Sequence, residues 1–396
     1  MRLTKSFELS DYKHNKKILI YGAGNYGELA YRGLEMWGIH PDFFIDEYYD
    51  KEKYINVPVI RPPQIEEYKD EIILLASLNF FQEMLEEVVS NKCTNYYDIL
   101  SLLQADYDNS IISEYLLEEK NTSNLKYKNV IDNVELNRLV IPHLDVVLTE
   151  CCTLKCKDCA NLMQYYSKPE NLSLTEIIEN LHNFLDTVDS VIELRLLGGE
   201  PFICKEIDKI IVEFANEVKV KRIVIITNST VVPSKKIIES LKNPKVFVHM
   251  SNYGLISTKI HELRNIFDEQ RIGYYIHEYK EWNDIGGIEK REYMLSEIDS
   301  IYKRCYMARC FTFYRGKFFL CPRSAHGEQL GVFKNKPQEF VDFRQQVFDW
   351  KEKRREMESI LQNKKHITAC EYCSGSYRES PKISAAIQVN KRSRQR

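Results

Sequence analysis

The chain has 396 residues, of which 44% are hydrophobic and 29% are charged, an ordinary globular composition. At roughly 150 residues per domain, this length predicts two or three domains. Fifty-eight acidic residues against 55 Lys and Arg leave a net charge of −3, which excludes a chain dominated by nucleic-acid-binding charge. The longest apolar run, Ile72–Leu78, is far shorter than the roughly 18 residues of a membrane span. Because the N-terminus also lacks the apolar core of a signal peptide, we expect a cytoplasmic protein with no nucleic-acid or membrane partner.

Residues 1–104 are expected to form a small α/β domain. A short apolar strand (residues 16–21) runs directly into a glycine-rich segment with Gly22, Gly24 and Gly27, and a helical pattern follows. A second strand ends at Asp46. This is the context in which a glycine loop at a helix N-terminus binds the phosphates of a dinucleotide and an acidic residue binds its ribose. The alternative is a purely structural domain without a ligand.

Residues 105–142 are polar and are interpreted as a linker with one or two helices. From residue 143 to about 300 the chain alternates between short apolar runs and amphipathic segments. The expected strands are 144–149, 191–197, 222–227, 245–250 and 272–277, with four helices between them. This alternation predicts a parallel sheet or partial barrel whose functional loops follow the C-terminal ends of the strands.

The remaining residues follow a different pattern. Residues 311–321 predict a hairpin with Gly316 near its turn. Residues 337–361 predict one long charged helix, with Phe340, Phe343, Val347 and Trp350 as its buried stripe. Residues 381–396 form a basic tail, and its last six residues, KRSRQR (391–396), are expected to be a solvated disordered end.

Eleven cysteines in a chain without an export signal favour metal ligands or catalytic groups over disulfides. Cys93 and Cys204 stand alone and are interpreted as buried apolar side chains. The other nine form a first group of Cys151, Cys152, Cys156 and Cys159, and a second group of Cys305, Cys310, Cys321, Cys370 and Cys373.

The first group lies directly after the first expected strand of the alternating region. Cys152, Cys156 and Cys159 have the spacing C-x3-C-x2-C. Three thiolates on one short loop can bind three irons of a [4Fe–4S] cluster and leave the fourth iron open to an exogenous ligand. A zinc site completed by Cys151 or by a distant ligand is the alternative.

The following strands end in residues suited to ligand binding. The second ends in Gly198, Gly199, Glu200 and Pro201, where glycines allow close backbone approach and a carboxylate can accept hydrogen bonds from an ammonium group. The third and fourth strands end near Asn228 and Ser251, whose short polar side chains suit a ribose or a carboxylate. Each pattern alone is also typical of a turn or a helix cap.

In this combination, residues 143–280 resemble the radical S-adenosylmethionine (SAM) enzymes, which have a partial (β/α)6 barrel. The resemblance implies that Cys152, Cys156 and Cys159 hold the cluster, that its open iron binds the methionine half of SAM, and that the Gly198–Pro201 loop contacts the SAM amino group. Ser251 matches the position near the ribose. The implied reaction cleaves SAM reductively and yields a 5′-deoxyadenosyl radical that abstracts hydrogen from a substrate, with flavodoxin or ferredoxin as electron donor. One departure is Asp158, where the family usually has an aromatic residue, which puts the adenine contact in doubt.

The second cysteine group, in residues 301–380, resembles the auxiliary-cluster extension called SPASM, or its shorter form, Twitch. Cys370 and Cys373 form C-x2-C, and the chain has no cysteine after them, which favours Twitch and one auxiliary [4Fe–4S] cluster. The resemblance implies Cys321, Cys370 and Cys373 as three ligands, and Cys310 is favoured over Cys305 as the fourth. A structural four-cysteine zinc knuckle is the alternative.

Residues 1–104 resemble the small Rossmann-like domains attached to sugar-modifying enzymes, through FIDE (44–47) and VPVI-x-PP (57–63). This resemblance implies a nucleotide or nucleotide-sugar at Gly22, Gly24, Gly27 and Asp46, and a substrate that is a sugar, a nucleotide-sugar or a glycan-linked small molecule. The alternative within the same class is a peptide or protein substrate. Outside it, the alternatives are a zinc-stabilised scaffold and an NAD-dependent oxidoreductase.

Overall fold

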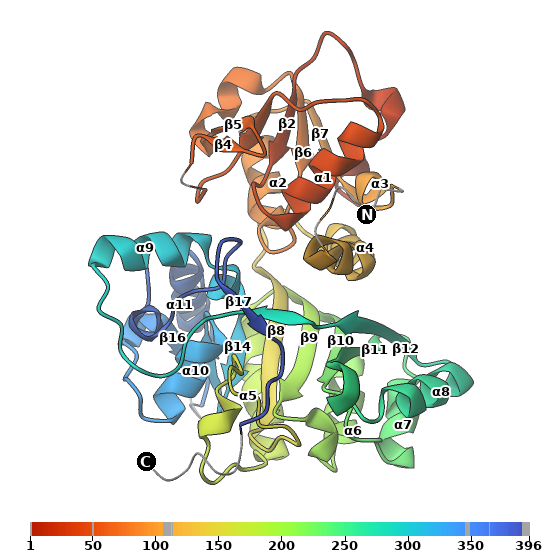
Figure 1. Cartoon of the computed structure of the whole chain (residues 1–396), viewed down its shortest axis with the longest axis vertical. Coiled ribbons are helices and arrows are strands. Elements are labelled where there is room, and N and C mark those ends of the chain that lie inside the picture. Colours follow the sequence, from red (N-terminus) through yellow and green to blue (C-terminus); the bar gives the residue numbers. More distant parts are fainter. Residues whose placement is uncertain are drawn as a thin grey trace. The chain divides into compact units, whose positions relative to one another are not determined.

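The computed structural model describes residues 2–49, 51–105, 112, 114–344, 349–363 and 365–389. The chain divides into two compact units, Met1–Pro142 and His143–Arg396, each with its own main sheet (Figure 1). Both sheets are predominantly parallel and carry helices, so the expected mixed α/β class is confirmed. Within the described residues, no helix is long and apolar enough to cross a membrane.

The first unit contains a seven-stranded sheet with the order β1-β7-β6-β2-β3-β5-β4. Its strands are β1 (Lys5–Ser6), β2 (Ile18–Tyr21), β3 (Phe43–Ile45), β4 (Lys53–Tyr54), β5 (Val57–Ile60), β6 (Ile72–Leu75) and β7 (Asn95–Asp98). Strands β2 and β6 are buried along their whole length, as in parallel sheets covered on both faces. From β2 the chain proceeds outward through β3 and β5, and it then returns to β6 on the other side of β2. The loop after β2 therefore lies at the point where the strand order reverses.

The helices of the first unit are α1 (Asn25–Met36), α2 (Phe81–Ser90), α3 (Leu100–Leu103) and α4 (Glu114–Asn133). Helix α4 lies in the segment interpreted as a linker, yet it packs against α1 and α3. Its Tyr127 is fully buried, stacks on Tyr26 and donates a hydrogen bond to the Leu75 carbonyl of β6. The segment therefore belongs to the first unit, because a few apolar side chains at helical spacing suffice to anchor a mostly polar helix. Residues 106–111 and 113 of the expected linker lie outside the described residues.

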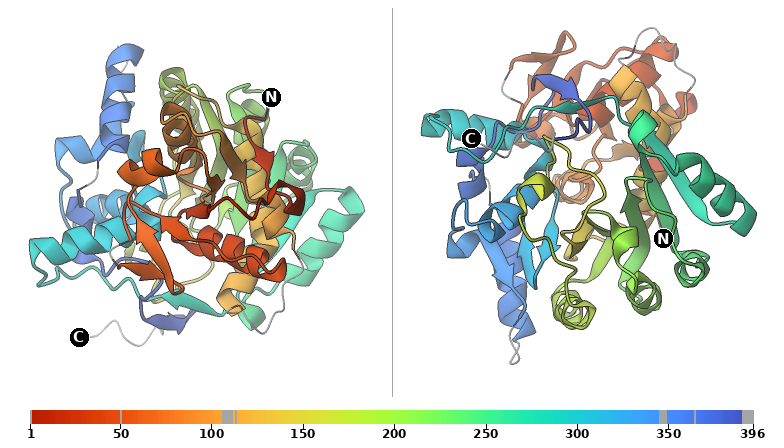
Figure 2. Two further views of the ribbon diagram at one scale, coloured as in Figure 1. Left: turned by 90° about the horizontal axis from the view of Figure 1, so that it is seen from above. Right: turned by 60° about the horizontal axis from the view of Figure 1, so that its bottom comes forward.

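The second unit contains an eight-stranded sheet with the order β12-β11-β10-β9-β8-β14-β15-β16. The five strands expected from the alternation are present as β8 (Val140–Thr149), β9 (Ser190–Gly198), β10 (Val220–Thr227), β11 (Val246–Asn252) and β12 (Gly273–Glu278). The four helices between them are α5 (Leu174–Thr187), α6 (Ile207–Ala215), α7 (Lys235–Leu241) and α8 (Ile260–Gln270). All four helices lie on one face of this sheet (Figure 2). The capping interaction at the start of α5 is present, since the Ser173 side chain accepts a hydrogen bond from the Glu176 amide.

The opposite face of this sheet, here called the inner face, carries polar side chains. It is identified by Val147 and Leu197, which pack against Tyr314 and against Ala325 of a C-terminal helix. Because side chains alternate along a strand, residues two or four positions away share that face. Strand registers place the following side chains on it: Asp145, Glu193, Arg195, Arg222, Phe247, His249, Ser251, Tyr275 and His277.

The C-terminal segment extends the same sheet. Strands β14 (Thr312–Tyr314) and β15 (Lys317–Phe319) form the expected hairpin, and β14 pairs in parallel with β8. Gly316 occupies its turn with φ of +72°, a left-handed conformation that favours glycine. The helices of this part are α9 (Leu295–Arg304), α10 (Pro322–Gln329) and α11 (Trp350–Leu361).

The expected single helix over 337–361 is wrong. Phe340–Asp342 forms the edge strand β16, which pairs with β15, and helix α11 begins only at Trp350. Trp350 is 48% exposed, whereas Phe343 is fully buried. Pairing with β15 overrides the local helical pattern, as tertiary contacts often do for short segments. Val347 lies outside the described residues.

The segment after residue 381 is ordered as far as it is described. Strand β17 (Lys382–Ser384) pairs antiparallel with β13 (Glu281–Asn283), and Gln388 forms an isolated bridge with Cys156. We call residues 382–389 the C-terminal strap. These residues find backbone partners far away in the sequence, whereas the end expected to be disordered, residues 391–396, lies outside the described residues. Residues 390–396 lie outside the described residues.

Candidate functional site

The first cysteine loop follows β8 and is held against the end of β9 by backbone hydrogen bonds. The Gly199 amide donates to the Thr149 carbonyl at 2.8 Å, and the Glu200 amide donates to the Cys151 carbonyl at 2.9 Å. A Cβ on Gly199 would lie 2.0 Å from the Cys151 oxygen, and one on Gly198 would lie 2.2 Å from the Thr149 oxygen. Gly198 also has φ of +144°. The absence of a side chain at these two glycines lets the backbone of the cysteine loop pack against them, and their expected close approach to a ligand stays a prediction.

Glu200 is completely buried and its carboxylate is already occupied. It accepts hydrogen bonds from the Thr227 hydroxyl and the Asn228 amide, each at 2.8 Å, and from the Phe202 amide at 3.1 Å. Burial raises the pKa of Glu200 to about 7. The Glu200 carboxylate thus ties the end of β9 to the end of β10, and its expected contact with an ammonium group stays a prediction. Pro201 begins the short 3-10 helix Pro201–Ile203 immediately afterwards.

Two side-chain amides donate to sulfurs of the first group. Asn228 Nδ2 lies 3.6 Å from Cys152 Sγ, and Gln388 Nε2 of the C-terminal strap lies 3.3 Å from Cys156 Sγ. The strap is held in place by backbone contacts, in which the Lys157 amide donates to the Ile387 carbonyl at 2.7 Å. Hydrogen bonds to sulfur are among the features that tune iron–sulfur clusters. Asn228 was expected at the site from the sequence, whereas Gln388 was missed because it belongs to no motif.

The thiols of this loop lie in surroundings that disfavour their charged form. Burial raises the pKa of Cys152 to about 12 and that of Cys156 to about 11, and it raises the pKa of Cys159 as well. Without a cation these groups are therefore neutral near pH 7. A bound metal would hold them as thiolates, because a coordinating thiol is deprotonated.

Ser251 and Tyr253 lie beside the same loop. Ser251 is buried at the end of β11, and its side chain interacts with the Tyr253 hydroxyl. Burial raises the pKa of Tyr253, and the three cysteines of the loop raise it further through their proximity. Tyr253 stacks on Tyr279 with ring centroids 5.5 Å apart. The structure thus brings Asn228, Ser251 and the cysteine loop together, and it adds Tyr253, which the sequence pattern did not single out.

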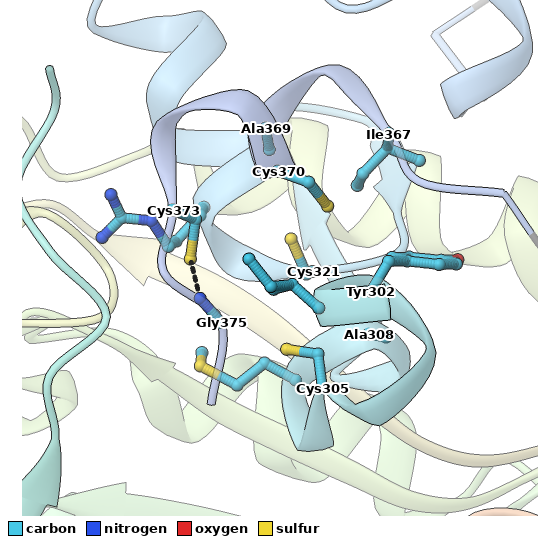
Figure 3. Close-up of a pocket in the computed structure, with 12 residues that line it drawn as sticks. Tyr302, Cys305, Ala308, Cys321, Ile367, Ala369, Cys370, Cys373 and Gly375 are labelled. Atoms are coloured by element: carbon cyan, nitrogen blue, oxygen red, sulfur yellow. Dashed lines mark hydrogen bonds between the residues drawn. The ribbon is translucent and has the colours of Figure 1, made fainter. Parts of the chain in front are cut away.

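The second cysteine group lines a cavity between α9, α10 and the 3-10 helix Thr368–Tyr372 (Figure 3). The thiols that line it belong to Cys305, Cys321, Cys370 and Cys373. The Gly375 amide donates to Cys373 Sγ at 3.3 Å, and the Ser376 amide donates to Cys305 Sγ at 3.4 Å. Burial raises the pKa of Cys305 to about 11 and that of Cys321 to about 12. The rest of the lining is largely apolar.

Cys310, the favoured fourth member of this group, does not line the cavity. Its sulfur lies 3.7 Å from the Tyr306 carbonyl, and burial together with the Asp145 charge raises its pKa. Cys305 stands at the end of α9, where its sulfur enters the cavity, and the turn Tyr306–Arg309 then carries the chain away to the start of β14. The preference for Cys310 rested on its closeness to the hairpin in sequence, which says nothing about the side of the chain that faces the cavity.

Arg323 on α10 lies at the wall of this cavity and is 4% exposed. Its guanidinium donates to the Gly286 carbonyl at 3.1 Å and to the Tyr372 carbonyl at 3.0 Å. Its charge opposes the rise in pKa at both Cys159 and Cys321, so it is close to both cysteine groups. Among the described residues, no three His, Cys, Asp or Glu side chains are grouped so as to hold a single metal ion.

The glycine loop of the first unit has the expected strand–loop–helix context. A Cβ on Gly22 would lie 2.5 Å from the Ala76 oxygen, one on Gly27 would lie 1.9 Å from the Gly22 oxygen, and Gly24 has open space around it. The Asp46 carboxylate accepts hydrogen bonds from the amides of Ala23, Tyr48 and Tyr49. Asp46 therefore holds the loop in shape, and its expected contact with a ribose stays a prediction.

Comparisons with known proteins find a family match and relatives in sequence. Residues 146–253 match the model of the Radical SAM superfamily. A GTP 3′,8-cyclase of Stenotrophomonas maltophilia (strain R551-3) is 33% identical over 95 residues, which cover 24% of this chain and 28% of the relative. A mitochondrial GTP 3′,8-cyclase of Arabidopsis thaliana is 32% identical over 95 residues, which are 24% of each chain. The chain thus spans about a quarter of the length of these relatives.

Solved structures show only a distant likeness. Native anSMEcpe with bound AdoMet has a TM-score of 0.37 and 13% identity, covering 60% of this chain and 84% of that one. BtrN in complex with AdoMet and 2-DOIA has a TM-score of 0.33 and 14% identity, covering 58% and 92%. The match in sequence is therefore to one segment: residues 146–253, which carry the C-x3-C-x2-C loop, match the Radical SAM superfamily model.

Proposed function

We propose that the chain is a radical SAM enzyme in which Cys152, Cys156 and Cys159 hold a [4Fe–4S] cluster. The observation that carries the proposal is the C-x3-C-x2-C loop at the end of β8, inside the segment that matches the family model. The donor set fits, since three thiols share one loop and side-chain amides donate to two of their sulfurs. When bound, the cluster and SAM supply one-electron cleavage of the sulfonium and a 5′-deoxyadenosyl radical. An electron donor such as flavodoxin or ferredoxin would supply the electron.

The chain's own residues would position and tune this cofactor pair. Asn228 and Gln388 would donate to cluster sulfurs, and Ser251 with Tyr253 would contact the nucleoside half of SAM beside the loop. Glu200 would act indirectly, because its carboxylate is engaged in holding β9 against β10. The C-terminal strap, whose backbone pairs with the cysteine loop, would help to keep water from the reacting atoms.

We further propose that the second cysteine group holds one auxiliary [4Fe–4S] cluster through Cys305, Cys321, Cys370 and Cys373. These four thiols enter one cavity with a largely apolar lining, and backbone amides donate to two of the sulfurs. Compared with the expectation from sequence, Cys305 replaces Cys310. Four cysteines are also a ligand set for structural zinc, the competing proposal, but no three of the described side chains are grouped so as to hold a single ion, which favours the cluster.

The grounds for a substrate class are the first unit and the relatives in sequence. The comparisons give no support to the sugar or nucleotide-sugar substrate suggested by the first unit, and the nucleotide at its glycine loop remains a proposal. Relatives named GTP 3′,8-cyclase favour a nucleotide among the small-molecule candidates, and a peptide substrate is the alternative.

Metal analysis and SAM cleavage test the proposal on the full chain after anaerobic purification and reconstitution. We expect about eight iron and eight sulfide per chain, and 5′-deoxyadenosine formation when dithionite is added. Cys156→Ala should abolish SAM cleavage, whereas the matched control Cys93→Ala, a buried thiol in the first unit, should retain it. Stoichiometric zinc without iron would overturn the proposal, as would SAM cleavage retained by Cys156→Ala.

A further inference from the structure

The inner face of the second sheet carries four charged side chains that are largely buried, and ion pairs connect all four: Asp145, Glu193, Arg195 and Arg222. Arg195 donates to Glu193 Oε2 through Nε at 3.0 Å and through Nη2 at 2.9 Å. Its third nitrogen, Nη1, lies 3.8 Å from Asp145 Oδ1. The guanidinium of Arg195 is thus engaged on both edges by carboxylates of β8 and β9. All three guanidinium nitrogens of Arg195 thus have a carboxylate oxygen within 4 Å, although Asp145 Oδ1 and Glu193 Oε1 themselves accept no hydrogen bond.

Arg222, the fourth charged residue, is arranged differently. It is 4% exposed, and its guanidinium lies over the Phe247 ring at 3.6 Å from the centroid. Its Nη1 lies 3.8 Å from Glu193 Oε1, too far for a hydrogen bond. Its Nε and Nη2 atoms are buried and have no hydrogen-bond partner. Buried guanidinium donors are costly to leave unpaired, so this edge is a place where a partner is missing.

Nε and Nη2 form the edge of a guanidinium that presents two parallel N–H donors. That edge matches two oxygens of a carboxylate or a phosphate in a bidentate pair. The charges of Asp145, Glu193, Arg195 and Arg222 sum to zero. The two parallel N–H donors of Arg222, and not an excess of positive charge, would therefore bind the anion. We propose that Arg222 binds a carboxylate or phosphate group of the substrate inside the second unit, an inference that rests on the proposed radical SAM function.

The distance between Arg222 and the cysteine loop indicates which part of the substrate Arg222 would bind. Arg222 lies near the start of β10 and Asn228 follows its end, so six residues, or about 20 Å of extended chain, separate them. Between these levels the inner face presents His249 and Tyr275, whose ring centroids lie 4.7 Å apart. The oxyanion would therefore be held far from the cysteine loop, and the reacting C–H bond would lie at the other end of an elongated substrate.

The test observes the Arg222 side chain directly by NMR. It uses the full, reconstituted protein, in which arginine carries 15N at its guanidinium nitrogens. Inorganic phosphate and acetate are titrated separately, and the Nε–H signals are recorded by NMR. Arg222→Lys identifies the Arg222 signal and removes the parallel donors, and Arg264→Lys, at an exposed site on α8, is the matched control. We expect one saturable shift, at the Arg222 signal, that Arg264→Lys keeps. In Arg222→Lys the affinity for the anion should fall at least tenfold.

The outcomes separate the possible sources and the two proposals. A response to phosphate alone assigns a phosphate ester, a response to acetate alone assigns a carboxylic acid, and either supports the inference. The inference is overturned if neither anion shifts the Arg222 signal, or if Arg222→Lys binds the anion as tightly as the wild-type protein does. If Arg222→Lys does not fold, Phe247→Leu, which removes the stacking partner, should weaken anion binding. SAM cleavage measured on the wild-type sample distinguishes failure of the radical SAM proposal from failure of this one.

Discussion

Exchanging Cys305 or Cys310 separately tests how the second cysteine group is built. Cys305→Ala removes a thiol from the cavity, where the neighbouring Ile301 and Ala308 offer no replacement ligand. We expect iron to fall from about eight to about four per chain after reconstitution and gel filtration. Cys310→Ala should stay at about eight, because that sulfur faces the Tyr306 carbonyl outside the cavity.

The structural costs of the two substitutions are similar, so folding does not confound the comparison. Cys305→Ala loses the hydrogen bond from the Ser376 amide, worth about 1 kcal/mol, and Cys310→Ala loses a comparable buried contact. Urea unfolding of both variants checks this equality. SAM cleavage monitors the first cluster, which both variants should retain. Iron at about four in Cys310→Ala with about eight in Cys305→Ala would refute the assignment and restore the expectation drawn from sequence.

Three further variants test the surroundings of the site and the first unit. Gly199→Ala should lower the free energy of unfolding by about 1–3 kcal/mol, because its Cβ would lie 2.0 Å from a carbonyl oxygen. The control Gly24→Ala has open space around its Cβ and should lower it by less than about 1 kcal/mol. Equal urea midpoints for the two variants would contradict this prediction. Gln388→Leu should lower the reduction potential of the first cluster in an EPR-monitored titration, since Cys156 loses its amide donor at 3.3 Å, and an unchanged potential would count against that contact. Tyr127→Phe should destabilise the first unit by about 1–3 kcal/mol, because a buried backbone carbonyl loses its donor; an unshifted urea transition would show that the hydroxyl does not stabilise this unit.

Local pattern was enough to predict the parts of the fold that depend on near neighbours in sequence. Strands β9, β10 and β11 of the second sheet are mostly buried and mostly apolar, so each can be found without knowing its partners. The helix beginning after Ser173 is indicated by its capping residues. The segment 340–342 was predicted wrongly by the same reasoning, since its strand depends on pairing with β15.

In the candidate site, too, local spacing predicted some features, and others depend on contacts between distant segments. Cys152, Cys156 and Cys159 stand within eight positions of one another, so their spacing alone indicates a shared ligand, and the sequence by itself determined this part of the protein. The contact between Cys156 and Gln388 joins residues 232 positions apart, and the choice of Cys305 over Cys310 depends on where α9 ends. The unpaired donors of Arg222 likewise exist only because β9 and β11 bring Glu193 and Phe247 beside it. Only the tertiary structure decided these features, because burial and hydrogen bonding depend on which distant segments come into contact, and a local sequence pattern does not contain that information.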